Sequence, residues 1–204
     1  MSPLERGRDW GRTAPLPPEA RWVNTDAEAA AIVTAARRRD QAPPPLVLTG
    51  GDISRTLGGT GDRPRLERGE GTNVTLDVGV ALIDGRLEWF VAHLVARRSW
   101  WRGRVLAVCN GAFIGGWNVA PRAHPGDGHL DVVDSRLSFV DRLRARRRLP
   151  AGRHLPHPGI STRRVTAMQF QLDPDLDIYL DGRAVGRARA ISVRIEPAAL
   201  EVWI

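Results

Sequence analysis

Residues 75–95 read TLDVGVALIDGRLEWFVAHLV, and this stretch decides the fold class. Two apolar runs, 75–82 and 87–95, flank the dipeptide Asp84-Gly85. Aspartate followed by glycine is a strong signal for the two-residue turn of a β-hairpin, because both turn positions need a positive φ. The stretch therefore predicts two antiparallel strands joined by a tight turn.

Short apolar runs continue to the C-terminus and alternate with turn signals. A second Asp-Gly dipeptide, Asp181-Gly182, lies between two of them, and one helix is expected from Ser138 to Arg148. Strands at this spacing are typical of an antiparallel sandwich or barrel. The expected strands cover 75–82, 87–95, 105–110, 130–133, 166–172, 178–180, 190–195 and 200–203.

The N-terminal part has the pattern of a small α/β unit. Thr25-Asp26-Ala27-Glu28 is a capping box that predicts a helix over 29–39, between short strands at 21–23 and 46–48. Thr49-Gly50-Gly51-Asp52 is a tight turn before a short helix at 53–57. The predicted fold class is therefore α+β, an antiparallel β-sandwich with a remnant α/β lobe. The predicted divisions are an irregular arm (1–20), the α/β remnant (21–58), a loop (59–73) and the β-sandwich (74–204).

The composition is that of an ordinary globular protein, with 204 residues, 42% of them hydrophobic, and a net charge of +7. Every one of the 30 basic residues is Arg, which indicates a coding bias more than a binding function. The sequence lacks both an apolar signal region and a run near the ~18 residues of a membrane span. Cys109 stands alone, so no internal disulfide is expected and a cytoplasmic setting is the default.

Several blocks of the sequence are similar to known motifs and follow one another in a fixed order. They are 49–58, similar to GTGNDFARTLG; 110–121, similar to NG-x-(Y/F)-x-GGG-x-x-x-AP; 124–133, similar to DDGLLDVV; 152–159, similar to G-x-H-x-x-HP-x-V; and 180–183 with 196–200, similar to LDGE and PGAL. In their order and spacing, these blocks resemble the bacterial diacylglycerol kinase and sphingosine kinase-like lipid kinases. The resemblance implies transfer of the γ-phosphate of ATP to a diacylglycerol-type hydroxyl with Mg²⁺.

The resemblance also implies a set of site residues. Asp181 would be the catalytic base or a metal ligand, although Asp-Gly is also plain hairpin chemistry. The turn formed by Thr49, Gly50, Gly51 and Asp52 would contact phosphate, or it is only a tight turn. The Asp127 carboxylate with the carbonyls of His124 and His129 would hold a structural Mg²⁺, or this loop is a turn closed by an Asx hydrogen bond. His154 and His157 are interpreted as structural; the alternative, a His-x-x-His metal pair, lacks an evident third ligand.

Two departures from the family weigh against ATP. The glycine-rich GGDGT loop would fall near 23–26, where no glycine occurs, and a side chain there blocks close approach of the backbone to phosphates. Arg183 replaces the glutamate of LDGE, and guanidinium neither holds Mg²⁺ nor accepts a proton. Two hypotheses follow. The first is a divergent lipid kinase, completed in one version by a partner chain or homodimer. The second is an inactive relative that binds lipid or nucleotide, or regulates a partner.

The segment RRSWWRGR, residues 97–104, combines tryptophan with arginine. Such a segment favours a lipid or anionic membrane surface, where Trp100 and Trp101 would lie among headgroups and the protein would be peripheral to the membrane. The alternative is that the tryptophans cover the core while the arginines are solvated. Binding of nucleic acid is not expected, because a recognised motif and stacking aromatics are absent.

Overall fold

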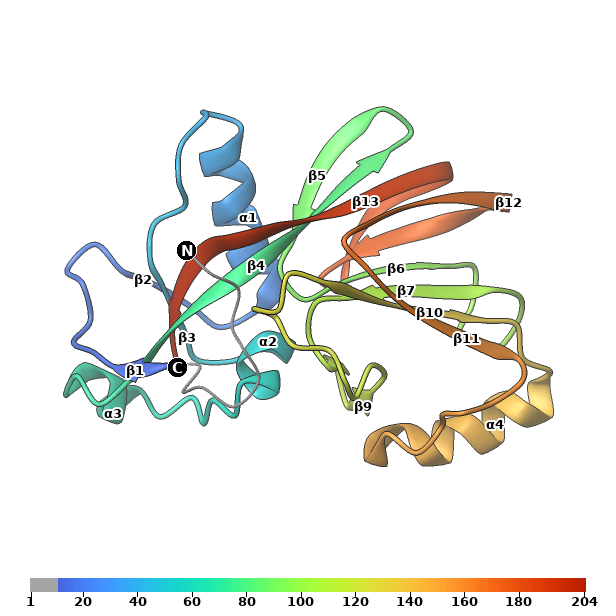
Figure 1. Ribbon diagram of the computed structural model, residues 1–204, viewed down its shortest axis with the longest axis horizontal. Helices are drawn as coiled ribbons and strands as arrows, with labels where there is room; N and C mark the ends of the chain where they lie inside the picture. Colours follow the sequence, from blue (N-terminus) through green and yellow to red (C-terminus); the bar gives the residue numbers. More distant parts are fainter. Residues whose placement is uncertain (1–10) are drawn as a thin grey trace.

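The computed structural model describes residues 11–204 and is built around one long, curled sheet (Figure 1). The described strands are β1 Arg12–Thr13, β2 Arg21–Val23, β3 Leu46–Leu48, β4 Thr72–Ile83, β5 Arg86–Phe90, β6 His93–Arg97, β7 Val105–Cys109, β8 Phe113–Ile114, β9 Trp117–Asn118, β10 Leu130–Ser135, β11 Ile160–Val165, β12 Ala167–Leu180 and β13 Arg183–Trp203. The described helices are α1 Asp26–Arg37, α2 Gly51–Thr56, α3 Arg63–Glu67, α4 Phe139–Arg148 and the 3₁₀ turn Leu149–Ala151.

The main path of the sheet runs β1-β4-β13-β12-β6-β7-β10-β11, with antiparallel neighbours along it. Strand β13 is 21 residues long and has an irregularity between Glu196 and Leu200. After it, Val202 and Trp203 pair in parallel with Leu46 and Val47 of β3. The last strand of the chain therefore joins the N-terminal β2–β3 pair to the antiparallel sheet, as Figure 1 shows.

The core has two main parts. One lies between α1 and the sheet, with Val33, Leu46 and Leu76 wholly buried. The other fills the inside of the curled sheet around Phe90 and Ile178. Strand β3 is buried along its whole length, as expected of a strand with parallel neighbours on both sides.

Most of the expected elements are confirmed. Thr25 accepts from the amide of Glu28 at the start of α1, and Ser138 caps α4. Both Asp-Gly turns form, with positive φ at Asp84, Gly85, Asp181 and Gly182. The antiparallel sheet beside a small N-terminal α/β part is the predicted fold class.

Some boundaries differ from the expectation. Within the stretch expected as a loop (59–73), Arg63–Glu67 forms a helix because Asp62 caps it and a proline stands in its first turn. Within the expected arm (1–20), Arg12 and Thr13 pair with β4, while residues 1–10 lie outside the described part of the chain. The run 87–95 is not one strand but two, β5 and β6, separated at Val91 and Ala92. The proposed division into domains stays a prediction.

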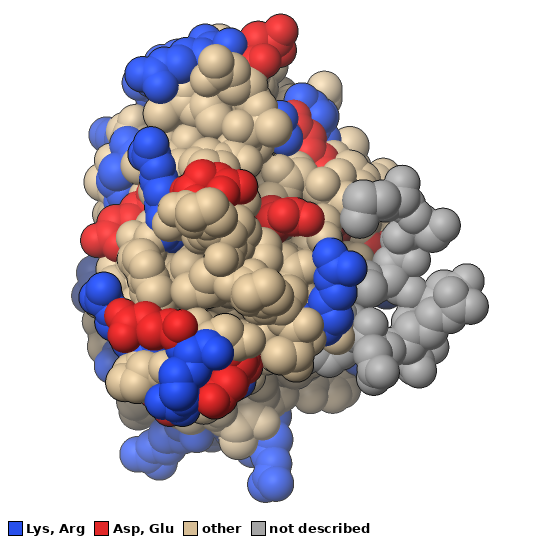
Figure 2. All heavy atoms as spheres, turned by 90° about the vertical axis from the view of Figure 1, so that its left-hand side faces the viewer, with Lys and Arg blue, Asp and Glu red and all other residues tan. Residues whose placement is uncertain are grey.

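Charges are mixed on the end of the molecule that carries β2 and α3. Figure 2 shows basic and acidic side chains interspersed there around a mostly uncharged centre. On this face, ion pairs such as Arg63–Glu67 and Arg68–Glu70 bring opposite charges together. A mixed surface of this kind differs from the single-sign patch that nucleic-acid binding needs.

Candidate functional site

The turn between β3 and α2 has the geometry of a tight strand-to-helix connection. The Thr49 hydroxyl donates to the carbonyl of Val23 at 3.1 Å, and Gly51 has a φ of +93°. A Cβ at Gly51 would lie 2.6 Å from a carboxylate oxygen of Asp26. Glycine is therefore needed here both for its backbone conformation and because the carboxylate leaves no room for a side chain.

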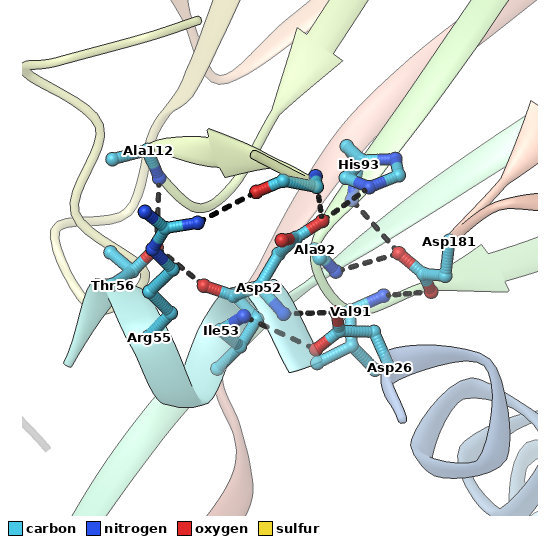
Figure 3. Close-up of polar contacts among 11 residues, drawn as sticks. Asp26, Asp52, Ile53, Arg55, Thr56, Val91, Ala92, His93, Ala112 and Asp181 are labelled. Atoms are coloured by element: carbon cyan, nitrogen blue, oxygen red, sulfur yellow. Dashed lines mark hydrogen bonds and ion pairs between the residues drawn. The ribbon is translucent and has the colours of Figure 1, made fainter. Parts of the chain in front are cut away.

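The side chain of Asp26, the first residue of α1, lies against the start of α2. Its Oδ2 accepts from the amide of Asp52 at 2.5 Å and its Oδ1 from the amide of Ile53 at 3.2 Å (Figure 3). Asp52 belongs to the turn that the sequence assigned to phosphate, and Ile53 directly follows that turn. Burial raises the pKa of Asp26 to about 6, and the nearby charge of Asp181 adds to this, although the two amides oppose it. In this arrangement a phosphate would have to displace Asp26, so the expected phosphate contact stays a prediction.

Asp52 and His93 form a second contact in the same cluster. His93 Nε2 lies 3.1 Å from Asp52 Oδ2, which also accepts from the amide of Gly115 at 2.9 Å. Burial alone would raise the pKa of Asp52, but the hydrogen bonds from His93 and Gly115 outweigh it and lower that pKa. Burial would lower the pKa of His93, and the surrounding carboxylates raise it instead. The pair is thus favoured in its charged form.

Asp181 is a buried acceptor for backbone amides. Its Oδ2 accepts from Val91 at 2.8 Å, and its Oδ1 accepts from Ala92 at 2.8 Å and His93 at 2.9 Å. Figure 3 shows these contacts, and the three amides belong to the β5–β6 connection and the first residue of β6. Burial raises the pKa of Asp181 despite His93 and the amides. The carboxylate therefore holds the β5–β6 connection, and its catalytic role stays a prediction.

Arg183 lies outside this cluster, although it follows Asp181 by two residues. Its side chain is about half exposed, and Nη2 lies 3.8 Å from an oxygen of Glu88. The position that carries the family's glutamate therefore holds a solvated cation on the outside of the hairpin. Residue 183 therefore adds no carboxylate to the cluster of Asp26, His93 and Asp181.

The loop 124–129 was expected to bind Mg²⁺. Asp127 Oδ1 accepts from the amide of His129 at 3.0 Å, and Oδ2 forms an ion pair with Arg164. Within residues 11–204, no group of three His, Cys, Asp or Glu side chains could hold a metal ion. The guanidinium of Arg164 competes with any cation for this carboxylate. The magnesium site remains a sequence-based prediction.

Three buried polar residues were missed by sequence reasoning as members of a site. Asp26 was interpreted only as part of the capping box, and His93 only as part of a strand. Asp77, also buried, accepts from the amides of Gly128 and Ala198 at 2.6 and 2.9 Å and so fixes the base of the expected magnesium loop. A single polar residue inside an apolar run was the available signal for His93 and Asp77.

An apolar cavity lies between α4 and strands β7 and β10. Its volume is about 90 Å³, and Trp100, Trp117 and Leu149 are among its lining residues. Trp100 and Trp117 meet edge to face at 5.1 Å. His154 lines it as well; His154 Nε2 lies 3.1 Å from the carbonyl of Val119, as expected of a structural histidine.

The tryptophan pair of the segment 97–104 is divided between inside and outside. Trp100 is half-buried and stacks under Arg97, whose guanidinium carbon lies 4.5 Å from the ring centre. Trp101 is 41% exposed and lies beside Phe139 of α4. The alternative of core-covering tryptophans thus fits Trp100, whereas Trp101 is partly exposed and its contact with a membrane stays a prediction. No described helix is long and apolar enough to cross a bilayer.

Comparisons with known proteins identify the fold and the family of the chain. Two crystal structures from Bacillus anthracis str. Sterne share the fold. One, provisionally named a diacylglycerol kinase, is 12% identical over 90% of this chain and 77% of that chain, with a TM-score of 0.71. The other, named a diacylglycerol kinase, is 15% identical over 90% and 75%, with a TM-score of 0.67. The search of curated proteins gave no match. Residues 82–204, more than half of the sequence, match the family described as the YegS C-terminal NAD kinase beta sandwich-like domain, and the chain belongs to that family.

Proposed function

We propose that this chain is a lipid-binding member of its family that does not transfer phosphate on its own. The observation that carries the proposal is the position of Asp26. Its carboxylate accepts hydrogen bonds from the two amides at the start of α2, and its negative charge repels a second anion such as phosphate there. The oxygens of Asp181 already accept three amides, which leaves about one lone-pair position for Mg²⁺ or a substrate hydroxyl.

The lipid part of the proposal rests on the cavity beside α4. Its walls are mainly tryptophan and aliphatic side chains, such as Trp117, Val133 and Leu149. The volume of about 90 Å³ is smaller than the roughly 150 Å³ cavity that admits benzene in another protein. It therefore suits the last few carbons of an acyl chain, with the rest of the lipid outside.

A divergent lipid kinase is the second candidate. Asp26, Asp52, His93 and Asp181 form a buried cluster with shifted pKa values, and such clusters are enriched at catalytic sites. In this case a partner chain would supply the missing nucleotide contacts, and Asp181 would leave its amides during the reaction.

Titration calorimetry with Mg-ATP and Mg-ADP separates the two candidates. If the lipid-binding proposal is right, no nucleotide binding should be detected at about millimolar nucleotide. A Kd of about 1 mM corresponds to a binding free energy of only about −4 kcal/mol, so this concentration detects even weak binding. Binding near micromolar that vanishes in Gly51→Val, together with phosphorylation of a diacylglycerol, would establish the kinase instead. The unfolding midpoint of Gly51→Val must be recorded, because a side chain there meets Asp26.

Tryptophan fluorescence tests the lipid half of the proposal. Short-chain diacylglycerol should change the emission in a saturable way, because Trp100 and Trp117 line the cavity. Ala107→Leu, which adds volume to a lining position, should weaken that response at least about tenfold while the chain remains folded. Absence of a saturable response in the wild type would remove the lipid assignment.

A further inference from the structure

The outer face of α4 is apolar. Phe139, Val140 and Leu143 are 60%, 54% and 41% exposed. Trp101, in the loop between β6 and β7, extends this face, with its ring centre 6.2 Å from that of Phe139. Four neighbouring large apolar side chains on a surface mark an interaction site more often than isolated ones do.

The helix is anchored from its other side. Arg142 is buried on the inner face and donates to the carbonyls of Leu137, Trp100 and Gly103. Ala145 is buried on the same inner face. The inner face thus already has its packing partners, so the apolar outer face is a fixed surface without a partner in residues 11–204.

Positive charge surrounds this apolar face. Besides the buried Arg142, the helix carries four exposed arginines, Arg144, Arg146, Arg147 and Arg148, against a single acidic residue, Asp141. Among these arginines only Arg144 lies within ion-pair distance of a carboxylate in the described chain, 3.5 Å from Asp141. Arg146 lies over the Trp101 ring at 4.6 Å. The end of the molecule shown in Figure 2, by contrast, has interspersed charges, and α4 lies at the other end in Figure 1.

Apolar side chains bordered by arginines are the composition of a helix that lies in the surface of a membrane. Phenylalanine, leucine and tryptophan enter the boundary between headgroups and acyl chains, while the arginines meet the lipid phosphates. A second copy of the chain is a poorer occupant, because a two-fold contact would bring the same arginines face to face. Charge complementarity therefore favours an anionic lipid surface.

We propose that Trp101, Phe139, Val140, Leu143 and the arginines of the last turn of α4, here called the α4 surface, dock this protein onto anionic membranes. Because Trp101 and Arg146 line the cavity as well as this surface, docking would place the cavity at the level of the lipids. The placement of the cavity for lipid entry rests on the proposed lipid-binding function, whereas the docking itself does not require that function.

Sedimentation of the full chain with vesicles tests the proposal. The vesicles are pure phosphatidylcholine or phosphatidylcholine with about one third phosphatidylglycerol, a fraction that gives a negative surface potential. The chain should bind the mixed vesicles. This binding should weaken steeply as the salt concentration is raised, because surface electrostatics are screened over about 8–10 Å at physiological salt. Phe139→Ser with Leu143→Ser should weaken the partition coefficient about 30-fold. Arg147→Gln with Arg148→Gln should weaken it about 30-fold as well.

Matched controls separate docking from general changes in the surface. Leu82→Ser with Leu87→Ser removes two apolar side chains of similar exposure, 43% and 45%, from the β4–β5 hairpin and should leave the partition coefficient unchanged. Failure of the wild type to bind anionic vesicles would overturn the proposal, and so would equal losses in the α4 and control variants. A dimer that forms without lipid and is lost in the α4 variant would assign the surface to a second copy instead. Nucleotide calorimetry and the fluorescence titration report on the proposed function independently.

Discussion

Replacing Asp181 by alanine should cost the protein a large part of its stability. The carboxylate accepts three backbone amides, from Val91, Ala92 and His93, and each of those residues is buried. An amide left buried without an acceptor costs about 1–2 kcal/mol, so three of them cost about 3–6 kcal/mol. Residue 181 also has a φ of 48°, which alanine tolerates worse than aspartate by about 1 kcal/mol.

The loss should be compared with the whole stability of a domain, which is about 5–15 kcal/mol. Asp181→Asn keeps one acceptor oxygen and the preference for positive φ, but turns an amide group toward one backbone N–H. It should therefore lose about 1–2 kcal/mol, less than the alanine variant. Asp177→Ala removes a half-exposed carboxylate that pairs with Arg187 at 3.3 Å and should lose less than about 1 kcal/mol.

Guanidinium unfolding followed by circular dichroism gives the three values in one buffer. The midpoints should fall in the order Asp177→Ala, Asp181→Asn, Asp181→Ala, with slopes similar to that of the wild type. If Asp181→Ala unfolds within about 0.5 kcal/mol of the wild type, the amides do not depend on the carboxylate. In that case Asp181 would be free for chemistry, and the reasoning against a stand-alone kinase would fail.

Two further predictions concern buried ionisable groups. The native pKa of Asp26 is raised from 3.8 to about 6, so the folded chain binds its proton more tightly than the unfolded chain does. Its contribution to the free energy of unfolding should therefore fall by about 3 kcal/mol between about pH 4 and pH 7. Urea unfolding measures this contribution as the free energy of unfolding of the wild type minus that of Asp26→Asn. A difference that grows with pH would contradict the prediction. Burial raises the pKa of Cys109, so a thiol reagent should modify it in denaturant and not in the native protein, and rapid native labelling would show that β7 opens.

Local sequence chemistry was sufficient for the turns and helix starts. Both positions of Asp84-Gly85 have a positive φ, 43° and 85°, which is the conformation that this dipeptide favours. Ser138 accepts from the amide of Asp141 at the start of α4. These features depend on residues within about four positions of one another, so a pattern of residue types is enough to predict them.

The polar cluster could not be predicted in the same way. Asp26 meets Asp52, and Asp181 meets His93, across separations of 26 and 88 residues. No local period encodes such pairs, since they arise only when the sheet brings β6 and the hairpin turn beside α2. The family motifs located Asp52 and Asp181 but gave the function of relatives, not the acceptor role that these carboxylates have here.

The survival of these motifs is therefore weaker support for catalysis than the sequence suggested. In an inactive relative, the sequences of these turns could have changed freely, so their presence favoured a kinase. In the folded chain, however, Gly51 is required by its φ of +93° and by the adjacent Asp26. Asp181 is required by three amides, and Gly182 by a φ of 82°. Each of these three residues has a structural reason to be present. Position 183 has no such constraint: its side chain is about half exposed, and there the chain has arginine where the resembling motif has glutamate.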